Sequence, residues 1–316
     1  MPERRRHLKQ TFAEWAWHLS AGLRPRGCFA LMYHRIGRPD DPLPHLDVTQ
    51  FRRQLEWLSR NCRVITPAAL HDAVRSGSPA RPPVLLTFDD GGRDYYDLAY
   101  PILKEFGMTA AVFLVTDYVD RPRLFWWDRL YLVVHNARLD RVSLPWQPGR
   151  PRPLGGANND RVFEECEQYL KSVTDDVKQR ALDDLVAAFG DPTLPDLGRQ
   201  IMSWDEVRAS MDLTTYGGHT HTHPLMSKVD EERVDREVGL CRARIVAETA
   251  VEPTLFAYPN GDFTSGAQAL VRRHGFEVAF STVEGINNGA TDWLAVRRTA
   301  VANLMPTRRM MVTSWM

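Results

Sequence analysis

An excess of charge of either sign is absent from this chain: among its 316 residues, 40 lysines and arginines balance 40 aspartates and glutamates. Without surplus positive charge the chain has no overall electrostatic attraction for nucleic acid, so we expect no nucleic-acid partner. An apolar run of the roughly 18 residues that a membrane-spanning helix requires is also absent. Hydrophobic residues still make up 43% of the chain, which is sufficient to bury a core and argues against disorder.

Cysteine is scarce, and its few copies lie far apart. None of them belongs to a CxxC pair, which argues against a zinc ribbon or a thioredoxin-like redox motif. We expect free, mostly buried thiols of the kind found in a reducing compartment, although the sequence leaves room for one disulfide. The four positions are Cys28, Cys62, Cys166 and Cys241.

The N-terminal segment, residues 1–27, is basic at positions 4–6 but lacks the apolar core of a signal peptide, because Lys9, Glu14 and His18 interrupt it. Its apolar residues recur at helical spacing and predict an amphipathic helix. This helix either packs on the domain or rests on an anionic membrane surface as a peripheral anchor. We therefore expect a location in the cytoplasm or peripheral to the inner membrane. The apolar face comprises Leu8, Phe12, Trp15, Leu19 and Leu23.

Between residues 28 and 303, short apolar runs alternate with amphipathic helical segments. This alternation predicts an α/β domain with parallel strands joined by right-handed crossovers. Residues 304–316 are expected to form a C-terminal tail. Strands are expected at 28–33, 84–88, 109–115, 216–218, 255–258 and 278–281. Helices are expected at 94–106, 230–248 and 266–274, and after two candidate N-caps, Thr49 and Thr66.

Residues 120–200 interrupt this rhythm, and we predict a mainly helical insertion rather than a separate domain. Its aromatic start, Phe125 to Trp127, either packs internally or forms a wall of a substrate cleft. A charged helical segment is expected at 162–189.

Two adjacent acids, Asp89 and Asp90, follow the predicted strand 84–88. Buried like charges repel each other and lose hydration, so this pair is costly unless a cation or hydrogen-bond donors compensate it. In parallel α/β folds, active sites gather at the carboxyl ends of the strands. The pair therefore indicates an active site, and the alternative is an Asp-Gly turn with solvated acids.

Three histidines occur within five residues, at positions 219, 221 and 223. His219 and His223 are four apart, so one helical turn would place both imidazoles on one face, with His221 directed elsewhere. Neutral imidazole suits zinc and its neighbours, whereas the HExxH protease motif is excluded because Thr220 stands in place of its glutamate. Together with the two acids, these histidines predict a two-histidine, one-carboxylate metal site with a spare aspartate as general base. The motifs GxSxG, GxGxxG and the P-loop are absent.

Three segments in chain order resemble the motifs of the NodB-type polysaccharide deacetylases of carbohydrate esterase family 4: Thr-Phe-Asp-Asp-Gly at 87–91, His-Thr-x-x-His-Pro at 219–224 and Phe-Ala-Tyr-Pro-x-Gly at 256–261. The resemblance covers about residues 28–303. It implies a distorted (β/α)7-type barrel that removes N-acetyl groups from an aminosugar-containing glycan. It also implies a divalent metal, with zinc the expected ion.

By this resemblance, Asp89 is the general base on metal-bound water. The backbone N–H of Asn260 shares the developing oxyanion charge with the metal, in a substrate-binding turn that includes Tyr258 and Pro259. The implied metal ligands are Asp90, His219 and His223.

The chain departs from the family pattern in the third motif, where the arginine that steadies the base is missing. Arg298 is our candidate replacement, with Arg297 as its competitor. Asn260 stands where the family has an aromatic sugar platform.

The usual C-terminal Leu-His motif, which carries the catalytic acid, is missing too, since no histidine follows His274. His34 instead ends the first predicted strand, which resembles the permuted subgroup that deacetylates poly-N-acetylglucosamine-type exopolysaccharides. We predict that His34 is the general acid, because the pKa range of histidine suits protonation of a leaving amine near neutral pH. The alternative is a histidine satisfied within the core.

Two other functions stay open at this point. The basic N-terminus and the lack of a signal peptide favour a deformylase or deacetylase of a lipid-carrier-linked sugar. The altered third motif and the missing C-terminal histidine favour a non-catalytic carbohydrate-binding protein on the same scaffold.

Overall fold

The computed structural model describes residues 26–76 and 80–301. Nearly all of the predicted N-terminal helix, and the whole predicted C-terminal tail, lie outside the described residues. Within the described part, no helix combines the length and apolar character needed to cross a membrane. All four cysteines are free and buried, so that prediction is confirmed.

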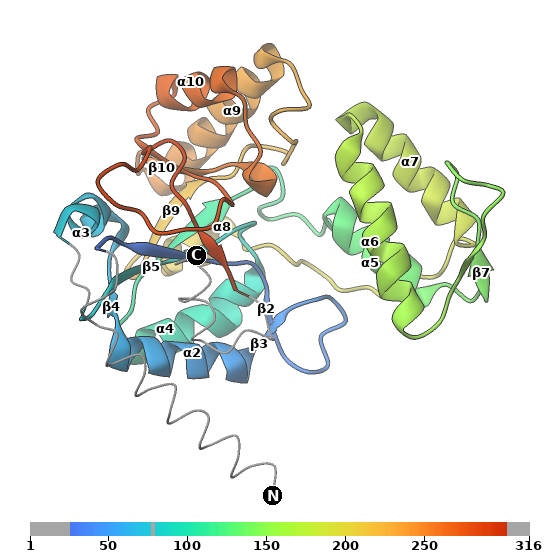
Figure 1. Cartoon of the computed structure of the whole chain (residues 1–316), viewed down its shortest axis with the longest axis horizontal. Helices are drawn as coiled ribbons and strands as arrows, with labels where there is room; N and C mark the ends of the chain where they lie inside the picture. The colour runs from blue at the N-terminus through green and yellow to red at the C-terminus, as the bar shows by residue number, and fades with distance from the viewer. Residues whose placement is uncertain (1–25, 77–79, 302–316) are drawn as a thin grey trace, which may run out of the picture.

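The described residues include an eight-stranded parallel sheet, which lies among helices in the left part of Figure 1. Its path runs β11-β10-β9-β6-β5-β1-β12, and β4 pairs with the start of β5. Uniformly apolar and buried strands such as β6 are typical of parallel sheets covered on both faces. The strands are β1 (Phe29–Tyr33), β4 (Arg63–Val64), β5 (Pro83–Phe88), β6 (Ala110–Leu114), β9 (Thr214–Gly218), β10 (Leu255–Ala257), β11 (Val278–Phe280) and β12 (Thr299–Ala300).

The sheet curls into a barrel because its last strand returns to its first. β12 pairs in parallel with β1, and Val296, just before β12, forms a parallel bridge with Phe280 of β11. Side chains alternate between the two faces of each strand. One set fills the barrel interior, and the other packs outward against helices. The interior set includes Ala30, Leu85, Phe113, Ala257 and Phe280. The predicted distorted (β/α) barrel is confirmed.

Helices cover the outside of the barrel, and two of them differ in detail from the sequence prediction. The first begins after Asp47, whose carboxylate accepts the backbone N–H groups of Thr49 and Gln50, so Thr49 is not the cap. An acidic side chain placed here satisfies two free donors of the first helical turn. The predicted helix 94–106 opens with a π-helical turn, Tyr95–Ala99. The helices are α2 (Val48–Asn61), α3 (Leu70–Ser76), α4 (Tyr100–Phe106), α8 (Trp204–Ala209), α9 (Glu231–Thr249) and α10 (Ser265–Arg273).

The insertion between β6 and β9 forms a helical lobe beside the barrel (Figure 1). We call residues 126–189 the insertion lobe; it contains α5 (Trp126–Asn136), α6 (Ala157–Ser172) and α7 (Asp175–Ala188). These helices enclose a hydrophobic cluster of their own, which includes Leu130, Val162, Leu170 and Leu185. The predicted helical insertion is confirmed, although the segment 162–189 is two helices, because α6 ends at Ser172 and α7 begins at Asp175.

Candidate active site

The predicted site residues converge at the carboxyl-terminal edge of the barrel. His34 follows β1, Asp89 and Asp90 follow β5, His219 follows β9, and Asn260 lies in the turn after β10. Because the strands are parallel, their carboxyl ends meet at one edge. All five residues line one cavity of about 250 Å³.

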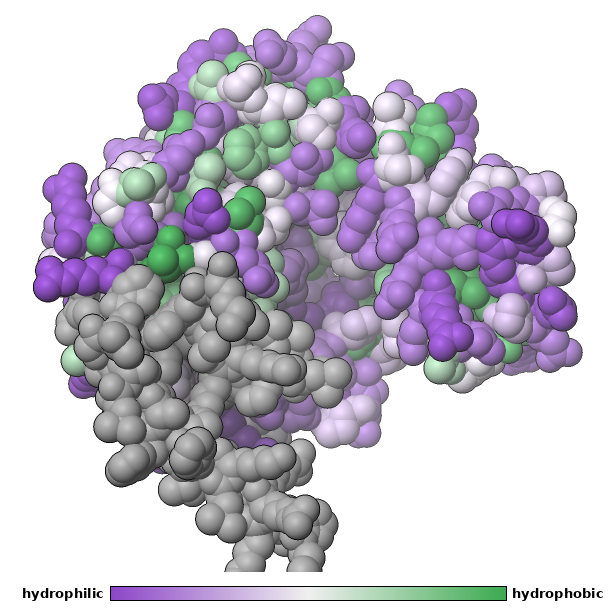
Figure 2. Space-filling model, viewed as in Figure 1, coloured by the Kyte–Doolittle hydropathy of each residue, from purple (hydrophilic) through white to green (hydrophobic). Residues whose placement is uncertain are grey.

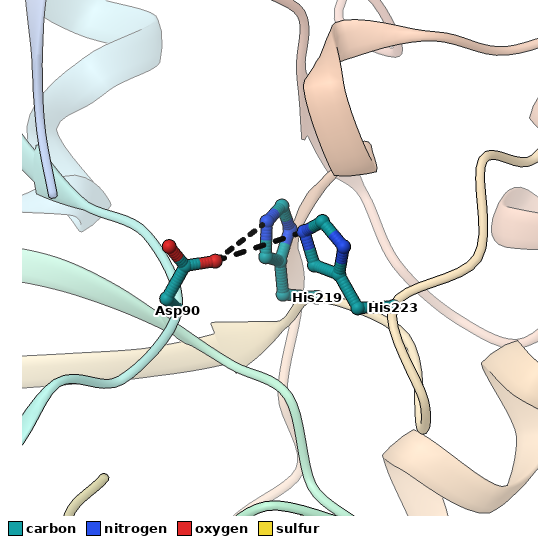
Figure 3. Close-up of side chains that lie close together, drawn as sticks. All are labelled: Asp90, His219 and His223. Atoms are coloured by element: carbon teal, nitrogen blue, oxygen red, sulfur yellow. Dashed lines mark ion pairs between the residues drawn. The ribbon is translucent and has the colours of Figure 1, made fainter. Parts of the chain in front are cut away.

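Asp90, His219 and His223 form the centre of this cavity. Each offers one donor atom, and the three atoms lie within 4.8 Å of one another. Nε2 of each imidazole is 3.6 Å from Oδ1 of Asp90 (Figure 3). Two imidazole nitrogens and one carboxylate oxygen form a ligand set that suits zinc and its transition-metal neighbours, with positions left for water and substrate.

A loop, and not the helical turn expected from the spacing, brings the two histidines together. Thr220 and His223 both adopt φ of 65°, a left-handed conformation that is costly for residues with a side chain. The hydroxyl of Thr220 accepts the backbone N–H of His223 at 2.9 Å, which helps to hold this shape. His221 is directed away from the cluster, with Nδ1 2.9 Å from the Thr116 hydroxyl.

A buried carboxylate on α9 holds the same loop from outside. Glu237 accepts the backbone N–H groups of His221 and Thr222 at 2.9 and 2.7 Å and the Thr222 hydroxyl at 2.5 Å. Sequence reasoning missed this residue. The available signal was an acid on the same buried helix face as Val238 and Cys241.

The hydrogen bonds and electrostatics of the histidines fit a metal ligand role. Nδ1 of His219 lies 2.7 Å from the carbonyl oxygen of Ala257, so Nδ1 carries the proton and Nε2 presents its lone pair to Asp90. Burial lowers the pKa of His219 to about 4. Burial and the neighbouring His219 hold the pKa of His223 well below its usual value. Both imidazoles are therefore neutral near pH 7, as metal binding requires.

The pKa of Asp90 is shifted in the opposite direction from the pKa values of the two histidines. Burial, followed by the charge of Asp89, raises the pKa of Asp90 well above its usual value. An ionised carboxylate at this position is unfavourable until a cation compensates it. The donor set and its electrostatics thus fit a divalent cation.

Asp89 faces the same cavity but is held by a different partner. Arg298 donates to both of its carboxylate oxygens, at 2.6 and 2.8 Å. Burial raises the pKa of Asp89, but Arg298, His219 and His34 together outweigh burial and hold that pKa well below its usual range. Arg297, the competing candidate, instead donates to the carbonyl oxygen of Glu284. The structure therefore places Arg298, not Arg297, against the predicted base.

His34 lies near Asp89 and lines the same cavity. Its Nε2 is 3.8 Å from Oδ2 of Asp89, and 52% of its side chain is exposed in the cleft. Loss of hydration within the cleft lowers the pKa of His34, and the smaller effect of Asp89 opposes this. The imidazole is thus within the site and is accessible, unlike a histidine satisfied in the core.

Of the three site residues predicted in the third motif, only Asn260 faces the cavity. Asn260 lines the cavity with φ of 56°, in a turn closed by the N–H groups of Gly261 and Asp262. Tyr258 and Pro259 are buried and do not line it. These two residues support the turn and do not face a substrate directly.

The insertion lobe supplies a wall of the cavity, which is one of the two roles predicted for its aromatic start. Trp126 and Trp127 line it, whereas Phe125 is buried and stacks on Trp127 at 4.4 Å. Of the aromatic residues 125–127, Phe125 therefore packs internally, and Trp126 and Trp127 form a wall of the cavity. The lobe also contributes Glu167, Lys171 and Lys178, which carried no sequence signal because charged residues on a helix are usually solvated.

The polysaccharide deacetylase family matches residues 76–142 and 197–279, on either side of most of the insertion. Bacillus subtilis YxkH, named provisionally as a polysaccharide deacetylase, is 36% identical over 87 residues, which are 27% of this chain and 30% of that protein. The poly-beta-1,6-N-acetyl-D-glucosamine N-deacetylase of Escherichia coli K12 is 31% identical over 100 residues, which are 30% of this chain and 15% of that protein. The matched segments span only 15% to 36% of the curated relatives' lengths.

Similarity of fold extends further than similarity of sequence. The structure of IcaB from Ammonifex degensii superposes with a TM-score of 0.61 at 18% identity, covering 92% of this chain and 97% of that one. Fold, motif order and family match agree: residues 76–142 and 197–279 form a domain of the polysaccharide deacetylase family.

Proposed function

We propose that this protein is a metal-dependent hydrolase that removes N-acetyl groups from an aminosugar-containing glycan. The observation that carries the proposal is the arrangement of Asp90, His219 and His223 within 4.8 Å, beside an arginine-bound aspartate and an accessible histidine. Such a constellation serves amide hydrolysis better than carbohydrate binding, because a binding protein has no need of a base beside metal ligands.

In this proposal the metal is held by Asp90, His219 and His223, whose donor atoms lie within 4.8 Å of one another. A divalent cation held there would supply Lewis-acid chemistry, polarising an amide carbonyl and lowering the pKa of a water molecule. Asp89 accepts the proton of the attacking water, and its two bonds to Arg298 keep the carboxylate ionised and oriented.

His34 acts as the general acid in this proposal. Its exposed imidazole, 3.8 Å from Asp89, is accessible to a substrate in the cleft and can donate a proton to the departing amine. Asn260, in the turn at the cavity edge, contributes its backbone N–H to the developing oxyanion.

The substrate class is proposed from the relatives. The Escherichia coli relative is named for poly-beta-1,6-N-acetyl-D-glucosamine, although the match covers 15% of that protein. We therefore propose an N-acetylated glycan of this kind, such as an exopolysaccharide. The altered third motif does not oppose this proposal, since Arg298 occupies the position of a partner to the base.

The proposal is tested with zinc-loaded protein and N-acetylglucosamine oligomers, with acetate release as the readout. We expect release to stop on chelation and to return with added zinc. Asp89→Asn is expected to reduce kcat by at least about 100-fold, the typical contribution of a general base, while zinc binding measured by competition with a dye is retained.

Asp184→Asn, an exposed acid of α7, is the matched control and should behave like the wild type. Full activity of Asp89→Asn would contradict the assigned base. Glycan binding without acetate release from any N-acetylated oligomer would support the non-catalytic alternative.

A further inference from the structure

The insertion lobe presents a row of side chains toward the barrel. Trp127 and Tyr131 are one helical turn apart on α5, and Phe163 and Glu167 are one turn apart on α6. Residues at this spacing share a helix face. All four line a second cavity of about 850 Å³.

This second cavity, which we call the lobe-side cavity, continues from the metal site. His34, Asp89, Asp90, Trp127 and Glu167 line both cavities. The surface is hollowed between the barrel and the insertion lobe (Figure 2). The two cavities are therefore parts of one cleft, and the larger part lies beyond the reacting centre.

An ion pair fixes the lobe face relative to the site. Arg35, the neighbour of His34, donates to both carboxylate oxygens of Asp128 on α5 at 3.0 and 2.9 Å. Their side chains are 17% and 3% exposed. A bidentate pair of this kind restricts both position and orientation. It holds Trp127 and Tyr131 at a set distance from the catalytic histidine.

We propose that the lobe-side cavity is a second sugar subsite, which binds a neutral pyranose unit adjacent to the one that is deacetylated. The inference rests on the proposed function, and it makes the substrate an oligosaccharide or polymer rather than a free monosaccharide. A cavity in the range of ~300–1,000 Å³ that is lined by aromatic rings and a few polar groups holds a ligand larger than one sugar ring.

The chemistry of the lining selects a sugar. Tyr131 and Phe163 meet edge to face at 5.4 Å and offer apolar surface to the C–H face of a pyranose. Glu164, which is exposed at the same cavity, accepts hydrogen bonds from ring hydroxyls. The acids of this cavity disfavour an anionic unit, whereas a neutral one meets no repulsion.

The subsite is tested by calorimetric titration of zinc-loaded Asp89→Asn protein with N-acetylglucosamine and its oligomers of two to five units. We expect affinity to increase from monomer to oligomers. Tyr131→Ala combined with Phe163→Ala should weaken oligomer binding about tenfold and leave monomer binding unchanged. In the active protein the same pair should raise KM for oligomers without lowering kcat.

Tyr169→Ala is the matched control, because Tyr169 is also an aromatic residue of α6 but stacks on Trp146 at 3.8 Å and lines neither cavity. Glu164→Lys tests the same cavity from an exposed position, so it does not depend on the folding of the double variant. It too should weaken oligomer binding.

Binding that is independent of chain length, or absent at every length, overturns the subsite. So does length-dependent binding that neither the double variant nor Glu164→Lys weakens. Length-dependent binding without acetate release from the wild type supports the subsite and rejects the proposed hydrolysis. Acetate release at equal kcat/KM from monomer and oligomers supports the proposed hydrolysis and rejects the subsite.

Discussion

Arg298 contacts Asp89 although 209 positions separate them in the chain. Their side chains are 0% and 3% exposed. Removing one partner of a buried ion pair leaves an uncompensated charge, at a cost of about 3–5 kcal/mol. Asp94 is in the contrasting situation. It accepts the backbone N–H of Ile36 at 2.6 Å, but burial raises its pKa from 3.8 to about 6 despite the opposing charge of Arg35.

This difference predicts how stability depends on pH. Because folded Asp94 binds its proton more tightly than the unfolded chain does, its titration makes stability fall as the pH rises from about 4 to about 6, with no further change above that range. The free energy of unfolding of Asp94→Asn, compared with that of the wild type, should therefore be about 1–2 kcal/mol higher at pH 7 than at pH 4. Urea unfolding at both pH values measures the gain. Asp97→Asn is the control, and an equal difference between Asp94→Asn and wild type at both pH values would contradict the argument.

At the scale of elements, the loop after β9 is shaped by α9. Its two left-handed residues, Thr220 and His223, persist because surrounding hydrogen bonds compensate their conformational cost. Glu237 provides three of these bonds from one carboxylate. The helix thereby positions the proposed metal ligands without lining the cavity that they form.

Glu237→Gln should weaken zinc binding about 10- to 100-fold, the range seen for residues that orient metal ligands. An amide has one acceptor oxygen, so it loses part of the three-bond contact to the loop. Competition with a zinc-binding dye measures the affinity, and urea unfolding of the metal-free protein separates it from general destabilisation. Glu232→Gln, 91% exposed in the first turn of α9, should bind zinc as the wild type does. Unchanged affinity in Glu237→Gln would remove its positioning role.

At the scale of the whole molecule, the barrel and the insertion lobe have separate hydrophobic clusters but share one cleft. Among residues 26–76 and 80–301, two polar links join them: the Arg35–Asp128 pair, and Arg233 of α9, which donates to Asp175 of α7 at 2.8 Å. The proposed metal ligands, Asp90, His219 and His223, belong to the barrel alone. Stability of the lobe and metal affinity are therefore expected to be largely independent.

Leu170→Ala, at a fully buried position of the lobe cluster, should destabilise the protein by about 2–5 kcal/mol through the cavity it leaves. Zinc affinity should change less than about twofold, because the ligands do not contact this cluster. Leu58→Ala is the counterpart in the hydrophobic cluster between α2 and the outside of the barrel. It should lower the melting temperature of the transition that zinc stabilises. Calorimetry with and without zinc distinguishes unfolding of the lobe from unfolding of the barrel. If zinc raises the melting temperature equally for the transition that each variant lowers, the lobe and the barrel unfold together, which would contradict the prediction.

Local pattern was enough to predict much of the chain. Apolar runs marked β1, β5 and β6, and the acids and histidines at strand ends indicated one site, because parallel strands direct their carboxyl ends to a common edge. Local pattern failed where a neighbour competes. Asp47 replaced Thr49 as a cap, and a left-handed loop replaced the expected helical turn.

The sequence by itself determined the family, the barrel and the identities of the candidate metal ligands, since these depend on residue types at short spacing. Only the tertiary structure decided between Arg298 and Arg297, brought His34 to Asp89 and set the aromatic face of the lobe against the candidate metal site. These contacts join residues far apart in the chain, and their geometry depends on how the barrel closes and how the lobe packs against it.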